Sequence, residues 1–303
     1  MATRANHDAS RMEGVINDMI NRSPHTEGII KAFKPLLMVR ERLTGELLLE
    51  PVDHSRINRE KLRKGIPCTG QVPFFLQGDP WDIMGLEVAG AVRQGFPYLA
   101  DDAAMLENGI RSGIVLYKAF SDFPKSMEQA VEKWSGAMNV KPQLVGLVLG
   151  AVARIILQAK TNGLGERIAA MGWEKGYCPV CGAHPTIAVI REKITQKWLH
   201  CSRCGHEWRF SRMICPGCAQ ESASGLEYFY VEDKKQETAF TCSHCKRYLI
   251  TLNHVSDLGD HDRDVSAMSL VHLDIIMQEK GYAPMTWCEW NAIYPNGKPT
   301  SVC

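Results

Sequence analysis

Apolar residues recur every three or four positions through most of the first 176 residues, which predicts a run of helices. Met12, Ile16 and Met19 belong to the first helix, and Pro24 ends it. Asp79 and Pro80 have the residue types of a helix N-cap and first turn, so we expect Asp79 to cap a helix. Further helices are expected over residues 29–43, 58–64, 79–94, 101–113, 126–138 and 141–161. Apolar side chains cover more than half of the last of these, which predicts the buried centre of a bundle.

Beyond Gly176 the apolar period changes from 3.6 to 2, which indicates short strands. The expected strands span 186–191, 197–200, 207–212, 226–231, 238–241 and 248–253. Helical periodicity returns after Asp264, which we expect to cap a last helix that ends at Lys280 and Gly281. The predicted class is therefore α+β, with an all-helical N-terminal domain followed by two small ribbon modules and a C-terminal helix. The expected domains are residues 1–175 (helical), 176–213 (first module), and 214–303 (second module with the terminal helix and tail).

Eight of the eleven cysteines fall in this strand-rich part, in four C-x-x-C pairs. They are Cys178, Cys181, Cys201, Cys204, Cys215, Cys218, Cys242 and Cys245. Two thiolates on one tight turn can bind one metal ion, and two such turns close a tetrahedral site. We therefore predict two four-cysteine metal sites, formed by the pairs in chain order because short loops cost less closure entropy. A nested pairing is the alternative, and disulfides are disfavoured because a bridge within C-x-x-C is strained.

Composition describes an ordinary soluble protein: 45% apolar residues, 23% charged residues and a net charge of +1. This charge gives no overall attraction to nucleic acid or to a membrane surface. The first residues lack the apolar run of a signal peptide, and the most apolar stretch, 144–157, is too short for a bilayer and contains Arg154. We expect a cytoplasmic protein with reduced thiols, without membrane insertion.

The remaining polar residues carry weaker signals. The isolated Cys68 is a candidate reactive thiol. The histidines beside the cysteine turns are expected to be structural or exposed and not ligands: His184, His200, His206 and His244. The acidic group is expected to be a solvated turn and helix cap: Asp260, His261, Asp262 and Asp264. Hydrolase, NTPase and dinucleotide motifs are missing from the sequence.

Taken together, these segments resemble the formate dehydrogenase accessory protein family, FdhE. The resemblance rests on residues 176–185, 198–208, 215–218 and 242–249 and on Gly281-Tyr282, so it is most specific from 176 to 282. Cys68, Cys288, Cys303 and the tryptophan-containing tail depart from the pattern.

The resemblance implies rubredoxin-like or zinc-ribbon modules, each with a four-cysteine metal site. It also implies a cytoplasmic maturation protein that binds the catalytic subunit of formate dehydrogenase, is needed for its activity and is not itself an enzyme. Iron is then favoured slightly over zinc, since four thiolates suit both metals. A homodimer is left open.

Two other functions compete with this one. A zinc-ribbon nucleic-acid-binding protein would use the basic residues of the first module: Arg191, Lys193, Lys197, Arg203, Arg209 and Arg212. A rubredoxin-like electron-transfer protein would need iron and a reversible change in visible absorbance.

Overall fold

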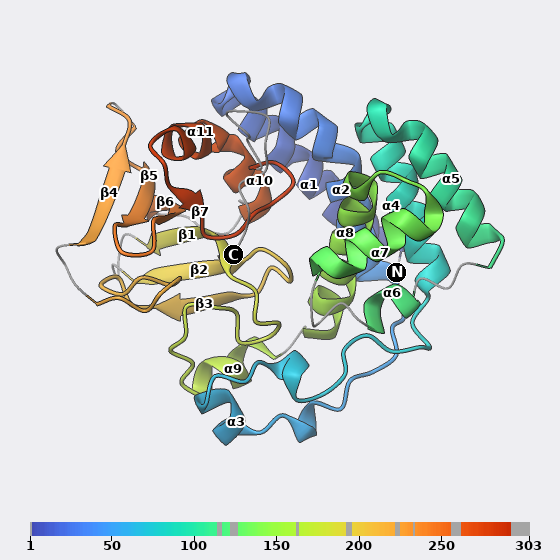
Figure 1. Cartoon of the computed structure of the whole chain (residues 1–303), viewed down its shortest axis with the longest axis horizontal. Coiled ribbons are helices and arrows are strands. Elements are labelled where there is room, and N and C mark those ends of the chain that lie inside the picture. The colour runs from blue at the N-terminus through green and yellow to red at the C-terminus, as the bar shows by residue number, and fades with distance from the viewer. Residues whose placement is uncertain are drawn as a thin grey trace. The chain divides into compact units, whose positions relative to one another are not determined.

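The computed structural model in Figure 1 describes residues 2–113, 117–121, 127–161, 164–191, 196–221, 225–232, 234–255 and 262–291. The chain forms two compact units, each made of several segments. Unit one comprises Met1–Asp18, Glu27–Asn58 and Cys68–Leu164, and unit two comprises Met19–Thr26, Arg59–Pro67 and Gly165–Cys303. The domain boundaries expected from the sequence, at 175/176 and 213/214, stay predictions.

Unit one is built from helices. They are α1 (Ala2–Arg22, whose last turn belongs to unit two), α2 (Glu27–Glu46), α4 (Trp81–Gly95), α5 (Ala100–Arg111), α6 (Tyr117–Ser121), α7 (Met127–Met138) and α8 (Pro142–Thr161). Helix α8 packs against α2, α4 and α7, and its apolar side chains are almost all buried, which confirms the predicted centre of the bundle. The argument from length was wrong, because α8 has 20 residues and is long and apolar enough to cross a membrane. However, 72% of its most apolar window is buried within the protein, as in a core helix.

Asp79 does not cap α4. Pro80 occupies the N-cap position and offers no side-chain hydrogen bond. The Asp79 carboxylate is buried instead, where it accepts hydrogen bonds from Lys160 Nζ at 2.7 Å and from the backbone N–H of Glu50 and Leu76 at 3.0 Å each. Because a buried ammonium needs a partner, Lys160 on α8 holds Asp79 more strongly than the first turn of α4 could.

The core of unit two is one sheet. Its strands are β1 (Pro185–Arg191), β2 (Lys197–Cys201), β3 (Glu207–Phe210), β4 (Leu226–Tyr230), β5 (Glu237–Cys242), β6 (Arg247–Val255) and β7 (Ala283–Pro284). The order is β3-β2-β1-β6-β5-β4, and β7 pairs with β6. Strands β1–β3 and β4–β6 are the two predicted antiparallel ribbons, and β1 and β6 join them in parallel.

Helices cover one face of this sheet. Helices α10 (Arg263–Ser269) and α11 (Val271–Glu279) pack on it. Figure 1 shows both helices beside β6 and β7. The shared core contains Ile187, Ala239, Tyr248, Ile250, Ala267, Leu270, Leu273 and Met277. Two short helices, α3 (Arg59–Arg63) and α9 (Gly165–Ala170), also belong to unit two.

The start of the last helical segment corrects two expectations. Asp262, not Asp264, is the N-cap of α10, and its carboxylate accepts from the backbone N–H of Asp264 and Val265. The segment is also two helices and not one, because the chain leaves helical geometry at Leu270. The predicted stop is confirmed: α11 ends at Glu279, and Gly281 has a φ of +83°.

Candidate metal centres

The eight paired cysteines gather in two groups of four, which confirms the grouping in chain order. We call Cys178, Cys181, Cys201 and Cys204 centre one, and Cys215, Cys218, Cys242 and Cys245 centre two. In each centre the four sulfur atoms lie within 4.8 Å of one another. The two ribbons therefore each bring one pair before their first strand together with one pair after their second strand.

All four C-x-x-C turns share one backbone geometry. The residue after the second cysteine has a positive φ: Gly182 (+76°), Gly205 (+70°), Ala219 (+57°) and Lys246 (+55°). The N–H of each donates to the carbonyl of the first cysteine of its turn, at 2.9, 3.2, 2.9 and 2.9 Å respectively. Glycine adopts this conformation without strain, whereas Ala219 and Lys246 do so at a cost that the surrounding fold must offset. The turns of centre two thus reproduce those of centre one without glycine at this position.

The sulfur spacing fits a tetrahedral ion. The Cys215–Cys245 and Cys218–Cys242 sulfurs are 3.7 and 3.8 Å apart. In centre one the Cys178–Cys204 and Cys181–Cys201 sulfurs are 3.5 and 3.4 Å apart. A tetrahedron with metal–sulfur bonds of about 2.3 Å has edges of about 3.8 Å, whereas a disulfide is only about 2.05 Å long. Each centre could therefore hold one metal ion, and an all-sulfur donor set suits zinc and iron alike.

Each centre contains thiols with raised pKa values and one thiol, Cys201 or Cys215, with a lowered pKa. Burial raises the pKa of the Cys178 thiol well above its ordinary value. In centre two, a hydrogen bond from Cys245 is the main factor that lowers the pKa of Cys215 to about 5. Thiolates bind metal and thiols do not, so loading centre one must release protons from a buried site.

Accessibility differs between the two centres. The cysteines of centre one are between 0% and 8% exposed, whereas Cys218 and Cys245 of centre two are only partly buried. A cavity of about 880 Å³ borders the first turn of centre two. Its wall includes Trp173, Tyr177, His184, Phe210 and the turn residues 215–219. Centre two is thus more accessible to solvent and small molecules than centre one.

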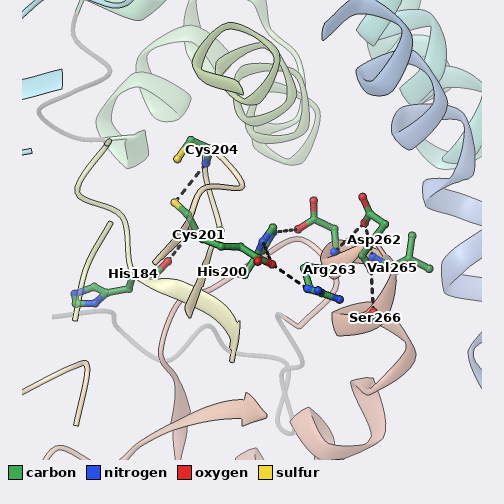
Figure 2. Close-up of polar contacts among 11 residues, drawn as sticks. His184, His200, Cys201, Cys204, Asp262, Arg263, Val265 and Ser266 are labelled. Carbon is green, nitrogen blue, oxygen red and sulfur yellow. Dashed lines mark hydrogen bonds and ion pairs between the residues drawn. The ribbon is translucent and has the colours of Figure 1, made fainter. Parts of the chain in front are cut away.

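The histidines next to the turns lie outside both sulfur groups. His200 and Cys201 are neighbours on β2, but Cys201 turns toward Cys204 and His200 turns toward Arg263 (Figure 2). His200 Nε2 lies 3.2 Å from Asp264 Oδ1, and His200 Nδ1 lies 3.7 Å from Glu207 Oε1. His184 and His206 are partly buried, and His244 is exposed.

A charged cluster surrounds His200. Arg263 Nε donates to Glu207 Oε1 at 2.9 Å. Burial acts to raise the pKa of Glu207, but His200 and Arg263 together lower it to about 2. Asp264, expected in a solvated turn, is only 2% exposed, so that expectation was wrong. No local pattern in the sequence indicates this cluster, because α10 brings Arg263 and Asp264 to strands more than fifty residues away.

Cys68 and Cys288 lie outside both sulfur groups. Cys68 is buried at 0% exposure in unit one, which leaves a reagent no direct access to its thiol. Cys288 is partly buried. Cys303, Asp260 and His261 lie outside the described residues.

Comparison with known proteins places the chain among relatives of one name. A family model described as "FdhE, central domain" matches residues 177–212, the segment that carries centre one. The chain is 29% identical to Protein FdhE of Salmonella dublin over 168 residues, which cover 52% of this chain and 53% of that one. It is 34% identical to Protein FdhE of Escherichia coli (strain K12) over 122 residues, 39% of this chain and 38% of the relative. The matches thus span about half or less of these relatives.

The fold has a relative as well. The crystal structure of the FdhE protein from Pseudomonas aeruginosa aligns with a TM-score of 0.61 and 22% identity, over 91% of this chain and 92% of that one. At this identity the match shows a shared fold. Together with this shared fold, the family model and the named sequence relatives support a relationship to the FdhE family, most specifically over residues 177–212.

Proposed function

We propose that this chain is an accessory protein that binds the catalytic subunit of formate dehydrogenase and is needed for that enzyme's activity. The observation that carries the proposal is the family match across residues 177–212, which coincides with the more buried of two four-cysteine centres. We further propose a cytoplasmic location, where thiols stay reduced and available to metal.

In this proposal all eight clustered cysteines are metal ligands, with one ion in each centre. Iron is favoured slightly over zinc through the family resemblance. Four sulfur ligands complete a tetrahedral shell and leave no open position for a substrate, so the proposed role is that of a binding protein and not an enzyme. The partner surface is then built from the protein around the centres, and the metal holds that surface in shape.

Deletion of the gene in its host, followed by an assay of formate dehydrogenase, tests this function. We expect activity to be lost and to return with the wild-type gene but not with Cys201→Ala, which removes one ligand of centre one. A tagged chain should also co-purify with the catalytic subunit. Normal formate dehydrogenase activity in the deletion strain would overturn the proposal.

Electron transfer is the second candidate, and the partial exposure of Cys218 and Cys245 favours it. Iron bound near the surface could exchange electrons with a partner. Aerobic and dithionite-reduced spectra of the iron-loaded chain decide this point. A reversible change in visible absorbance supports electron transfer, and its absence removes this candidate.

The structure weakens the nucleic-acid alternative. Lys197 is fully buried, and Arg191 and Arg209 both stack on the Trp198 ring, at 4.2 and 5.1 Å from its centre. Arg191 also lies 3.9 Å from Glu207. These contacts occupy part of the positive charge that would meet phosphates. Binding to DNA or RNA that weakens steeply with salt would revive this alternative.

A further inference from the structure

Lys197 is an unusual residue in unit two. Its side chain is 0% exposed, and its Nζ makes no hydrogen bond within the described part of the chain. A buried ammonium without hydrogen bonds is costly, because it has lost its water and gained no polar partner. The amine must therefore either lose its proton or have its charge compensated by another group.

Aromatic rings form the walls around this ammonium. Lys197 Nζ lies 4.0 Å from the centre of the Phe240 ring and 6.0 Å from that of Phe210. A cation over a ring face is stabilised by the electrons of the ring, but more weakly than by an anion. These two contacts fix the position of the ammonium without neutralising it.

The negative charge that acts on Lys197 comes from centre two. Burial lowers the pKa of the Lys197 amine to about 7, the Cys215 thiolate acts to raise it, and Arg212 acts to lower it further. Cys215 is thus the negative group that favours the ammonium. It belongs to centre two, although Lys197 itself belongs to the ribbon of centre one.

Strand geometry agrees with this direction. Phe240 and Cys242 are two residues apart on β5, so their side chains share a face and lie about 7 Å apart along the strand. On β2, four residues separate Lys197 from Cys201 of centre one, about 13 Å along the strand. The ammonium over Phe240 therefore lies beside β5, the strand that ends in Cys242 of centre two.

The negative charge of a metal-loaded centre two would compensate the positive charge of the Lys197 ammonium. Four thiolates around a divalent ion carry a net charge of −2, held in a partly buried site. We propose that Lys197, from the first ribbon, is the counter-cation of centre two, so that it strengthens metal binding there and joins the two ribbons electrostatically. This inference rests on the metal centres proposed above.

The test uses the full-length chain loaded with ¹¹³Cd, whose two resonances report the centres separately once Cys181→Ser and Cys218→Ser have assigned them. Titration with a competing chelator then gives the relative affinity of each centre. In Lys197→Met, which keeps the length of the side chain and removes its charge, we expect the cadmium affinity of centre two to fall about 10- to 100-fold. The affinity of centre one should stay unchanged.

Two controls separate charge from packing. Phe240→Leu removes the ring and keeps the ammonium, so its effect on centre two should be smaller than that of Lys197→Met. Lys197→Arg and Lys197→Gln are both long and polar, and the affinity of centre two should follow their charge by at least about tenfold. If Lys197→Met does not fold, the comparison of Lys197→Arg with Lys197→Gln still tests whether charge at this position affects metal binding at centre two.

The position of Lys197 makes the result decisive. A purely structural role in β2 would weaken centre one, whose Cys201 ends that strand. Loss at centre one alone, equal loss at both centres, or an unchanged centre two would each overturn the proposal. A wild-type chain that binds no cadmium would instead overturn the metal centres and the function built on them.

Discussion

The two centres should release their metal at different rates, and one side chain should account for much of the difference. The first turn of centre one, Cys178 to Cys181, contains Val180 between its cysteines, and this side chain is 0% exposed. The same position in centre two is Gly217, which has no side chain to bury. Opening the turn of centre one must therefore expose a valine, whereas opening that of centre two exposes none.

The expected change in the release rate follows from the number of buried carbon atoms in the Val180 side chain. Val180→Ala removes two carbon atoms from a buried position, and each buried carbon contributes about 0.8 kcal/mol. The free energy needed to open this turn should then fall by about 1.5–2 kcal/mol. Since about 1.4 kcal/mol corresponds to a tenfold rate change, release from centre one should accelerate about 10- to 30-fold.

The assay mixes the metal-loaded chain with an excess of a chromophoric chelator and follows metal release. The wild type should release one ion in a fast phase and one in a slow phase. Labelling of the freed thiols, followed by mass spectrometry, assigns the fast phase to centre two. In Val180→Ala only the slow phase should become faster, whereas Met213→Ala, at an exposed residue close to centre two in sequence, should change neither phase.

Three results would refute this reasoning. They are release of both ions in one phase, labelling of centre one first, and an unchanged slow phase in Val180→Ala. The first two would show that accessibility of the cysteines does not control release, and the last would show that Val180 does not.

Two further predictions concern stability. Asp79→Ala leaves the Lys160 ammonium buried without its carboxylate and should destabilise the protein to urea by about 3–5 kcal/mol, whereas adding Lys160→Met should restore part of the loss. Burial raises the pKa of Asp274 from 3.8 to about 7, although its hydrogen bond from Tyr248 acts to lower it. The folded chain therefore keeps a proton that the unfolded chain loses, so this stabilisation is complete below about pH 4 and is lost as the pH rises to about 7. In thermal denaturation between pH 5 and 8, Asp274→Asn should show a smaller decrease with pH than the wild type, and equal slopes would contradict the assignment.

Local patterns were good predictors where the physical cause is local. The strand expected at 197–200 is β2, Lys197–Cys201, because alternation and β-branched or aromatic residues act within a few positions. The stop at Gly281 was also found, since a glycine there adopts a positive φ without strain. The cap at Asp79 was wrong, because a buried lysine from α8 competed for the same carboxylate. The break at Leu270 was missed for a similar reason: the apolar pattern continues through it.

The sequence by itself determined the helical and strand-rich parts of the chain and the four cysteine turns, because periodicity and C-x-x-C spacing are properties of neighbouring residues. It also favoured the pairing of the turns in chain order, since short loops close most readily, and the structure then excluded the nested alternative. Only the tertiary structure decided that β1 and β6 join the two ribbons into one sheet, and that one centre is buried and the other is partly open. By its residue type, Lys197 was grouped with the basic residues of the first module. The tertiary structure instead buries it and places its ammonium on the ring of Phe240. These features depend on residues far apart in the chain, whose meeting is fixed by the packing of the whole unit and not by any local pattern.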